Sequence, residues 1–248
     1  MRLNGKITIV TGGASGFGEG IVRKFAAEGA QVVIADLNLE TAQALANELG
    51  DLALAMQVNV AQEADVARMI DDTRSYFGEI DILVNNAGTT HLPAPMEEVD
   101  EDDFDLVFGV NCKSVYLTAK HLVPHLKSQK SGAILNVAST AGVSPRPRLN
   151  WYNASKGWTI TATRAMAVEL APLGIRVNAI NPVAGDTPLL AKFMGEDTPE
   201  VREKFLSTIP IGRFSTPEDM GNAACYLCSD EASMVTGVCM EVDGGRCI

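Results

Sequence analysis

The chain has 248 residues, of which 46% are hydrophobic, and carries a formal net charge of −11. This length suits one domain with a large core, and the negative charge disfavours binding to nucleic acid or to anionic membrane surfaces. No apolar run reaches the ~18 residues of a membrane span, and the first predicted strand follows Met1 so closely that we expect no signal peptide and a cytoplasmic protein.

Strands and helices alternate along the chain. Apolar runs predict strands near residues 7–11, 31–35, 52–58, 80–84, 132–138, 175–180 and 238–242. Apolar residues at helical spacing predict helices near residues 17–28, 39–49, 62–77, 102–127, 152–171 and 217–228. This alternation is typical of a parallel sheet with helices on both faces. We therefore expect an α/β fold, a single doubly wound Rossmann-type domain over residues 1–248 with a parallel seven-stranded sheet.

A glycine-rich turn follows the first predicted strand. It reads Thr11-Gly12-Gly13-Ala14-Ser15-Gly16-Phe17-Gly18 and leads directly into the first predicted helix. Glycines let the backbone approach a pyrophosphate closely, and the N-terminus of a helix favours its negative charge. The strand, turn and helix together predict a dinucleotide-binding site.

Asp36 follows the second predicted strand, at the interval where a ribose-binding acid is expected. Its carboxylate is able to accept hydrogen bonds from both ribose hydroxyls of NAD. A 2′-phosphate would instead meet a like charge, at a cost of about 4 kcal/mol for unit charges ~4 Å apart at an effective dielectric of ~20. No Arg or Lys between Val32 and Asn59 offsets that repulsion. The sequence therefore favours NAD over NADP.

Tyr152 and Lys156 are four residues apart in a predicted helix, so their side chains lie on one face one turn apart. A free tyrosine titrates near pH ~10 and is a poor proton donor or acceptor at neutrality. A nearby ammonium favours the phenolate, so we expect Lys156 to lower the pKa of Tyr152. The pair suits general acid–base catalysis at the oxygen of an alcohol or ketone.

These motifs give the chain a clear family resemblance over essentially its whole length. It resembles the classical short-chain dehydrogenases/reductases, including the 3-oxoacyl reductase-like and glucose dehydrogenase-like members. The glycine turn matches the family's TGxxxGxG motif, and Asn85-Asn86-Ala87-Gly88 matches NNAG. Asn111, Ser139 and the Tyr152–Lys156 pair match the catalytic positions, in the family's order.

The resemblance implies a role for each of these residues. Ser139 hydrogen-bonds the substrate oxygen beside the Tyr152 hydroxyl, and Tyr152 exchanges the proton. Lys156 lowers the pKa of Tyr152 and holds the nicotinamide ribose. Asn111 links Lys156 to solvent through its backbone and a water. The implied cofactor-binding residues are Gly12, Ser15, Gly16, Phe17, Gly18, Asp36, Asn59, Val60, Asn86, Ala87, Gly88, Tyr152, Lys156, Pro182, Gly185 and Thr187.

Two positions depart from the family pattern. The family usually has an acid before the valine that follows its third strand, where it binds the adenine amino group, but this chain has Asn59-Val60. The Asn59 carbonyl is still an acceptor, without the charge. Where the family usually has Pro-Gly, this chain has Pro182-Val183, with Gly185 two residues on. Thr187 keeps the threonine expected near the nicotinamide carboxamide.

Cys225 and Cys228 have metal-site spacing, but they lie in a helical pattern with no second pair. Packing inside a helix is the better interpretation, and we expect no metal site.

Three segments are expected to border the nicotinamide: 89–96, 140–151 and a long connection near 187–210 that suits a mobile lid. Arg146 and Arg148 bring two cations close to Tyr152. One hypothesis is that either arginine binds a substrate carboxylate, sulfonate or phosphate, and the alternative is a solvated or intersubunit loop. His91 and Trp151 offer a different pocket, for a polyol or cyclic alcohol.

Three functions fit these residues. The leading hypothesis is an NAD-dependent dehydrogenase acting on a secondary alcohol, which is a sugar, polyol or cyclic alcohol. The second is a 3-oxoacyl-(acyl carrier) reductase, which Asp36 disfavours because such enzymes usually prefer NADPH. The third is a non-catalytic NAD-binding protein, which the complete catalytic set disfavours. The family resemblance also implies a homotetramer.

Overall fold

The computed structural model describes all residues 1–248 and contains one seven-stranded sheet. The strand order is β3-β2-β1-β4-β5-β6-β7, and every neighbouring pair is parallel. The strands are β1 (Ile7–Thr11), β2 (Gln31–Asp36), β3 (Ala53–Gln57), β4 (Ile82–Asn85), β5 (Gly132–Val137), β6 (Ile175–Pro182) and β7 (Cys239–Val242). The predicted α/β fold with a parallel seven-stranded sheet is confirmed.

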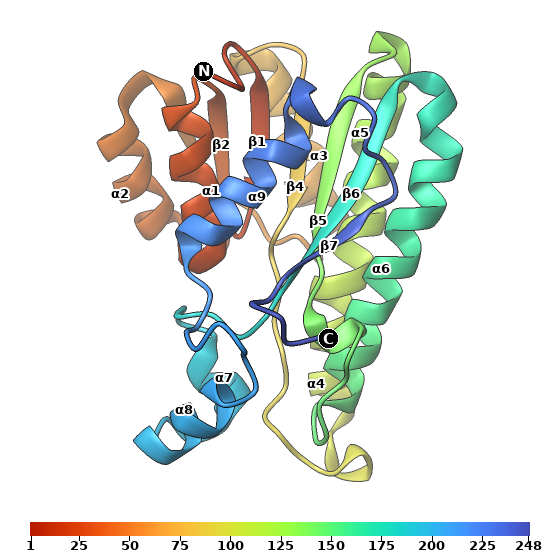
Figure 1. Ribbon diagram of the computed structural model, residues 1–248. Helices are drawn as coiled ribbons and strands as arrows, with labels where there is room; N and C mark the ends of the chain where they lie inside the picture. Colours follow the sequence, from red (N-terminus) through yellow and green to blue (C-terminus); the bar gives the residue numbers. More distant parts are fainter.

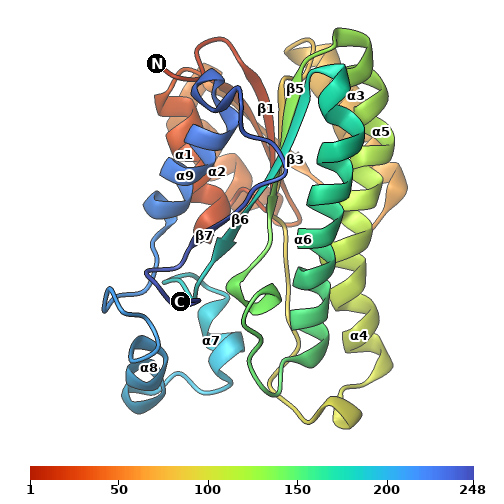
Figure 2. The ribbon, with the colours of Figure 1, turned by 45° about the vertical axis from the view of Figure 1, so that its right-hand side comes forward.

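Helices cover both faces of the sheet (Figures 1 and 2). One face carries α1 (Gly16–Ala27), α2 (Leu39–Leu49) and α9 (Pro217–Cys228). The other carries α3 (Glu63–Tyr76), α5 (Ser114–Gln129) and α6 (Asn150–Leu170). Each layer has its own core. Phe25 and Met220 belong to the first core, while Met69 and Leu122 belong to the second. None of the helices combines the length and apolarity that a bilayer crossing requires.

The strand order reverses direction beside β1, which pairs with β2 on one side and with β4 on the other. In open parallel sheets, ligands bind beyond the carboxyl ends of the strands at such a switch point. The loops that follow β1 and β4 therefore mark where the site belongs.

The helix predicted over residues 102–127 is interrupted. It is divided into α4 (Glu101–Phe108) and α5 by a π-helical turn at Gly109–Lys113. Apolar spacing alone predicted one continuous helix, because a single π turn leaves the overall pattern nearly unchanged. Such turns are frequent at functional sites, and this one contains Asn111.

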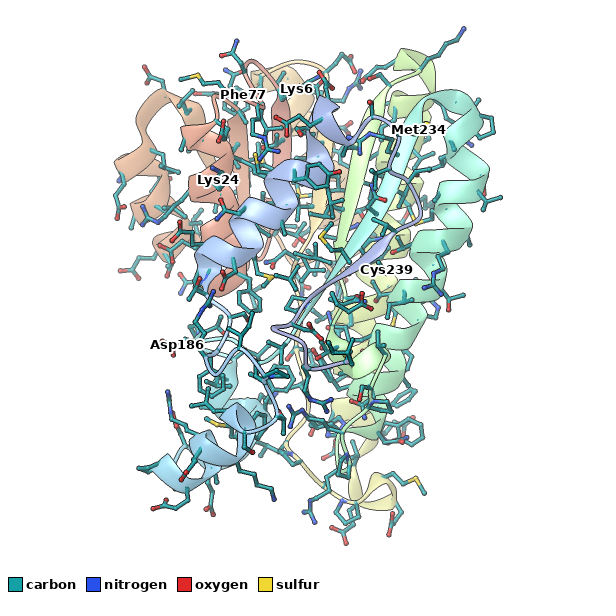
Figure 3. All side chains as sticks on the ribbon, viewed as in Figure 1. Lys6, Lys24, Phe77, Asp186, Met234 and Cys239 are labelled. Carbon is teal, nitrogen blue, oxygen red and sulfur yellow. The ribbon has the colours of Figure 1, made fainter.

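The predicted lid contains two helices that the sequence did not indicate, α7 (Leu190–Met194) and α8 (Pro199–Leu206). Both lie below the carboxyl ends of the strands, apart from the main helical layers (Figure 1). Asp186, labelled in Figure 3, lies where the chain leaves the end of β6 to enter this segment. The short length of α7 and the polar composition of α8 explain why periodicity did not reveal them.

Candidate active site

A cavity of about 560 Å³ lies at the carboxyl ends of the strands, next to the switch point. Every residue that the sequence predicts to bind the cofactor lines it, from Gly12 to Thr187. Ser139 lines it too, whereas Asn111 lies just behind the wall. The fold thus gathers into one cavity residues that are far apart in the chain.

The glycine turn is shaped by close backbone contacts. Gly12 has φ +61, and a Cβ there would lie 2.9 Å from the Ala87 Cα. A Cβ at Gly18 would lie 2.0 Å from the Gly12 carbonyl oxygen. Asn86 braces the turn, because its Nδ2 donates to the carbonyl oxygens of Thr11 and Gly12, both at 2.9 Å. Only glycine allows this approach, so the turn fits a pyrophosphate.

Asp36 ends β2 and lines the cavity beside the glycine turn. Its Oδ2 accepts from the Ala14 backbone N–H at 3.0 Å, and its Oδ1 accepts from the Asn38 N–H at 3.0 Å. Asp36 is the only carboxylate in the lining, and no cation stands beside it there, since the two lining cations are Arg146 and Lys156. This arrangement fits a ribose with free hydroxyls.

Asn59 lines the cavity at the position where the family pattern has an acid. Its Oδ1 accepts from the Ala61 N–H at 3.0 Å, and its own backbone N–H donates to the Asp65 carboxylate at 3.0 Å. Asp65, from α3, therefore holds this loop in place. Nothing in the sequence pattern singled out Asp65.

Tyr152 and Ser139 meet in another part of the cavity, away from Asp36. Ser139 begins the short turn after β5, and its Oγ accepts from the Ala141 N–H at 3.0 Å. Tyr152 is buried in α6, where burial raises its pKa to about 12 and a hydrogen bond with Ser139 only partly lowers it. The prediction that Lys156 lowers the pKa of Tyr152 is not met in this structure, because burial of the phenol is the larger effect.

Lys156 is buried near the Tyr152 ring and is bonded to the backbone. Its Nζ is 5.8 Å from the centre of the Tyr152 ring and donates to the Val137 carbonyl at 2.9 Å. Burial lowers the pKa of this ammonium to about 8. Asn111 supports the wall from behind, since its Nδ2 donates to the Thr89 carbonyl and to the Ser155 Oγ, each at 2.9 Å.

The second departure from the family pattern has a local explanation. The position that excludes a side chain is Gly185 rather than Val183, because a Cβ at Gly185 would be 2.2 Å from the Phe17 ring. Val183 is buried, and its carbonyl oxygen accepts from the Ser215 Oγ at 3.2 Å. Thr187 lies against Gly16, so the lid begins directly over the glycine turn.

The lid adds two aromatic side chains to the wall of the cavity. Phe193 of α7 meets the Tyr152 ring edge-on at 4.9 Å between centroids. Phe205 of α8 lies under the Arg146 guanidinium at 4.5 Å. Both phenylalanines line the cavity, as does Leu149. Sequence reasoning missed both, and the predicted lid was the only signal that pointed to their segment.

Three residues proposed for the substrate pocket do not line it. Arg148 is exposed, and its guanidinium donates to the Pro93 carbonyl at 3.3 Å. His91 is buried outside the cavity, with Nδ1 2.7 Å from the Leu92 carbonyl. The Trp151 indole donates to the Met96 carbonyl at 3.2 Å and packs on Phe104. The pocket of His91 and Trp151 is therefore not formed, and of the two candidate arginines only Arg146 lines the cavity.

Cys225 and Cys228 are both buried in α9 and belong to the hydrophobic core. The packing interpretation is confirmed. Burial raises the pKa of the Cys228 thiol to about 12.

A family model described as enoyl-(acyl carrier protein) reductase matches residues 12–246. The chain belongs to the short-chain dehydrogenase/reductase family of oxidoreductases. It is 51% identical to the 4-formylbenzenesulfonate dehydrogenase TsaC1/TsaC2 of Comamonas testosteroni, with 99% of each chain covered. It is 39% identical to a 3-oxoacyl-[acyl-carrier-protein] reductase of Thermotoga maritima, covering 100% of both chains.

The chain is also similar to one further relative and to one solved structure. The chain is 38% identical to the cis-4-hydroxycyclohexanecarboxylate dehydrogenase of Sinomonas cyclohexanicum, over 97% of this chain and 96% of the relative. A crystal structure of a 3-ketoacyl-(acyl-carrier-protein) reductase from Brucella melitensis, complexed with NADH, superposes with a TM-score of 0.95 at 49% identity. It covers 99% of this chain and 100% of that one.

Proposed function

We propose that the protein is an NAD(H)-dependent oxidoreductase that transfers a hydride between the nicotinamide and a secondary alcohol or ketone. The observation that carries this proposal is the cavity itself, which contains both Asp36 and the group formed by Tyr152, Ser139 and Lys156. The NADH bound in the Brucella melitensis structure supports the choice of cofactor. Among sugars, polyols and cyclic alcohols, the apolar aromatic lid favours a cyclic alcohol.

The chain's own residues hold the substrate oxygen and move its proton. Ser139 and Tyr152 both direct their hydroxyls to that oxygen, so that Tyr152 removes the proton from an alcohol or returns it to a ketone. When bound, the nicotinamide supplies or accepts the hydride. Lys156 holds the nicotinamide ribose, and Asn111 fixes the wall behind it by its bonds to Thr89 and Ser155.

The second candidate is a 3-oxoacyl-(acyl carrier) reductase, which the names of two of the relatives favour. Asp36 disfavours NADPH, but it does not exclude an NADH-dependent reductase. A non-catalytic NAD-binding protein is the third candidate, and the gathered catalytic set disfavours it.

The deciding experiment measures turnover with NAD and with NADP over polyols, cyclic alcohols, hydroxy acids and 3-oxoacyl thioesters. Oxidation of a cyclic alcohol with NAD, lost in Tyr152→Phe, is the expected result. Faster reduction of an acyl thioester would favour the second candidate. NADH binding without turnover on any substrate, in wild type and Tyr152→Phe alike, would favour the third.

We also propose a homotetramer formed through the outer faces of α5 and α6. Large apolar side chains are exposed on both helices, among them Tyr116, Trp158 and Val168, the last 80% exposed. Light scattering of the purified protein tests this, since a monomer at micromolar concentration would contradict it.

A further inference from the structure

We propose that Arg146 anchors an anionic group of the substrate, so that the enzyme acts on ring alcohols or ketones that carry a carboxylate or a sulfonate. This inference rests on the proposed function and specifies its substrate class. Three features support it: the charge of the cavity, the surroundings of Arg146 and the shape of the wall between Arg146 and Tyr152.

The substrate end of the cavity is positively charged and contains no acid. Asp36 is the only carboxylate in the lining, and it lies beside the glycine turn, where both its oxygens accept backbone hydrogen bonds. Of the two lining cations, Lys156 donates to the Val137 carbonyl behind Tyr152. Arg146 is therefore the cation that faces the space left for the substrate.

Arg146 is held in place without being neutralised. Its Nη2 donates to the Thr208 Oγ1 at 3.0 Å, and its guanidinium stacks over the Phe205 ring. It forms no salt bridge, in contrast to Arg202 and Arg213, which both pair with aspartates near the lid. A guanidinium has five N–H donors, so this contact leaves most of them for a ligand.

The environment of Arg146 makes an anion favourable there. The side chain is partly buried, and its pKa is lowered by that burial and by the nearby charge of Arg246. Arg246 has no acidic partner either, and donates to the Ser144 Oγ at 3.1 Å. The positive charges of Arg146 and Arg246 repel each other and neither forms a salt bridge, so an anionic ligand at Arg146 relieves that repulsion.

The wall between Arg146 and Tyr152 suits a ring. Phe193 covers the Tyr152 ring, Phe205 lies under Arg146, and Leu149 adds an aliphatic surface. A flat or cyclic body lying on this wall places its hydroxyl or carbonyl at Tyr152 and its acid group at the guanidinium. Arg148, two residues from Arg146 in the chain, is exposed and bonded to Pro93, so it provides a matched control.

The test compares pairs of substrates that differ only in charge, such as 4-hydroxycyclohexanecarboxylate and its methyl ester, and a matching ring alcohol that carries a sulfonate. The ratio of kcat/KM for the acid to kcat/KM for the ester is measured in the wild type, Arg146→Gln, Arg146→Lys and Arg148→Gln. For Arg146→Gln we expect that ratio to fall about 10- to 100-fold, because charge-assisted hydrogen bonds are lost.

Arg148→Gln is expected to keep the wild-type ratio, and Arg146→Lys to retain part of it, since the charge remains but the planar fork is lost. The carboxylate and sulfonate arms show which acid the site prefers. NADH affinity, measured by fluorescence titration, confirms that each variant is folded.

Three outcomes would overturn the anchor while leaving the proposed function intact: a wild type that prefers the ester, an Arg146→Gln variant with an unchanged ratio, or equal losses in Arg148→Gln. Inactivity on these pairs would overturn the anchor, whereas inactivity on every alcohol and ketone of the wider panel, with NAD and with NADP, would overturn the proposed function. The two failures are therefore distinguishable.

Discussion

Replacing Asp36 with Asn is expected to weaken the preference for NAD over NADP. The substitution removes the charge and keeps an oxygen acceptor for only one of the two backbone N–H groups, those of Ala14 and Asn38, that each bond to a separate carboxylate oxygen at 3.0 Å. A unit charge pair at ~4 Å is worth about 4 kcal/mol at an effective dielectric of ~20, which is close to a 10³-fold preference. Because Asp36 is partly exposed and salt screens it, we expect the realised change to be about 10- to 100-fold.

The assay measures kcat/KM for NAD and for NADP in the wild type and in Asp36→Asn. One alcohol is used throughout, at a constant and saturating concentration. The NAD/NADP ratio should fall, mainly because the KM for NADP falls, and raising the salt concentration should reduce the wild-type ratio. Asp65→Asn is a useful control, since its carboxylate contacts the Asn59 backbone rather than the cavity. A wild type that prefers NADP, or a ratio that Asp36→Asn leaves unchanged, would show that Asp36 does not select the cofactor.

Other substitutions probe the catalytic group, the glycine turn and the buried lysine. Tyr152→Phe should lower kcat about 10²- to 10⁴-fold with little change in NADH affinity, and unaltered turnover would remove Tyr152 from the mechanism. Gly185→Ala should weaken NADH binding about tenfold, as measured by fluorescence titration, because its Cβ would lie 2.2 Å from the Phe17 ring. Its matched control, Gly157→Ala in α6, meets no atom closer than 3.9 Å and should raise the free energy of unfolding by about 0.5–1 kcal/mol in denaturant titrations. The pKa of Lys156 is lowered to about 8 in the folded protein, so between pH 8 and ~10 the unfolded chain holds a proton there that the folded chain has lost, and Lys156 alone adds up to about 1.4 kcal/mol of stability per pH unit. Buried thiols with raised pKa, such as Cys228, act in the opposite direction over the same window, so the contribution of Lys156 is read from the difference between the wild type and Lys156→Met. The free energy of unfolding of the wild type relative to Lys156→Met should therefore increase from pH 8 to ~10, and a difference that stays constant or decreases would contradict the assignment.

The sheet could be predicted from the sequence because its strands are buried on both faces. Runs such as Ile7–Thr11 and Gln31–Asp36 are rich in β-branched residues, and nearly all of their side chains are buried. Strand boundaries therefore differ from prediction by at most a few residues. The sequence did not predict the interruption at Gly109–Lys113, because a π turn changes the backbone hydrogen bonds but leaves the spacing of apolar residues nearly unchanged.

The cofactor end of the site was also predictable, because its glycines and its acid occur at fixed intervals that can be recognised in the sequence alone. The substrate end was not. Phe193 and Phe205 come from short lid helices, and nothing in their spacing indicates that they meet Tyr152 and Arg146. Proximity in the chain was misleading for Trp151 and Arg148, since neighbouring residues in a helix or loop point in different directions.

The pKa of Tyr152 also could not be predicted from its spacing to Lys156 in the sequence. A lysine one turn away suggested a lowered value, but Lys156 reaches back to Val137 and the phenol is buried, so its pKa is raised to about 12. Ketone reduction at neutral pH then starts from a protonated Tyr152, which is the form that donates. Alcohol oxidation needs the deprotonated form and should accelerate as the pH rises.

Hydride transfer with Tyr152 as the proton carrier is tested by following NADH and product together when a cyclic secondary alcohol is mixed with NAD, in the wild type and in Tyr152→Phe. We predict one NADH for each ketone formed by the wild type and almost none from the variant, with NADH affinity retained in both. Equal rates in the two proteins, or no NADH from any alcohol in the wild type, would contradict this mechanism.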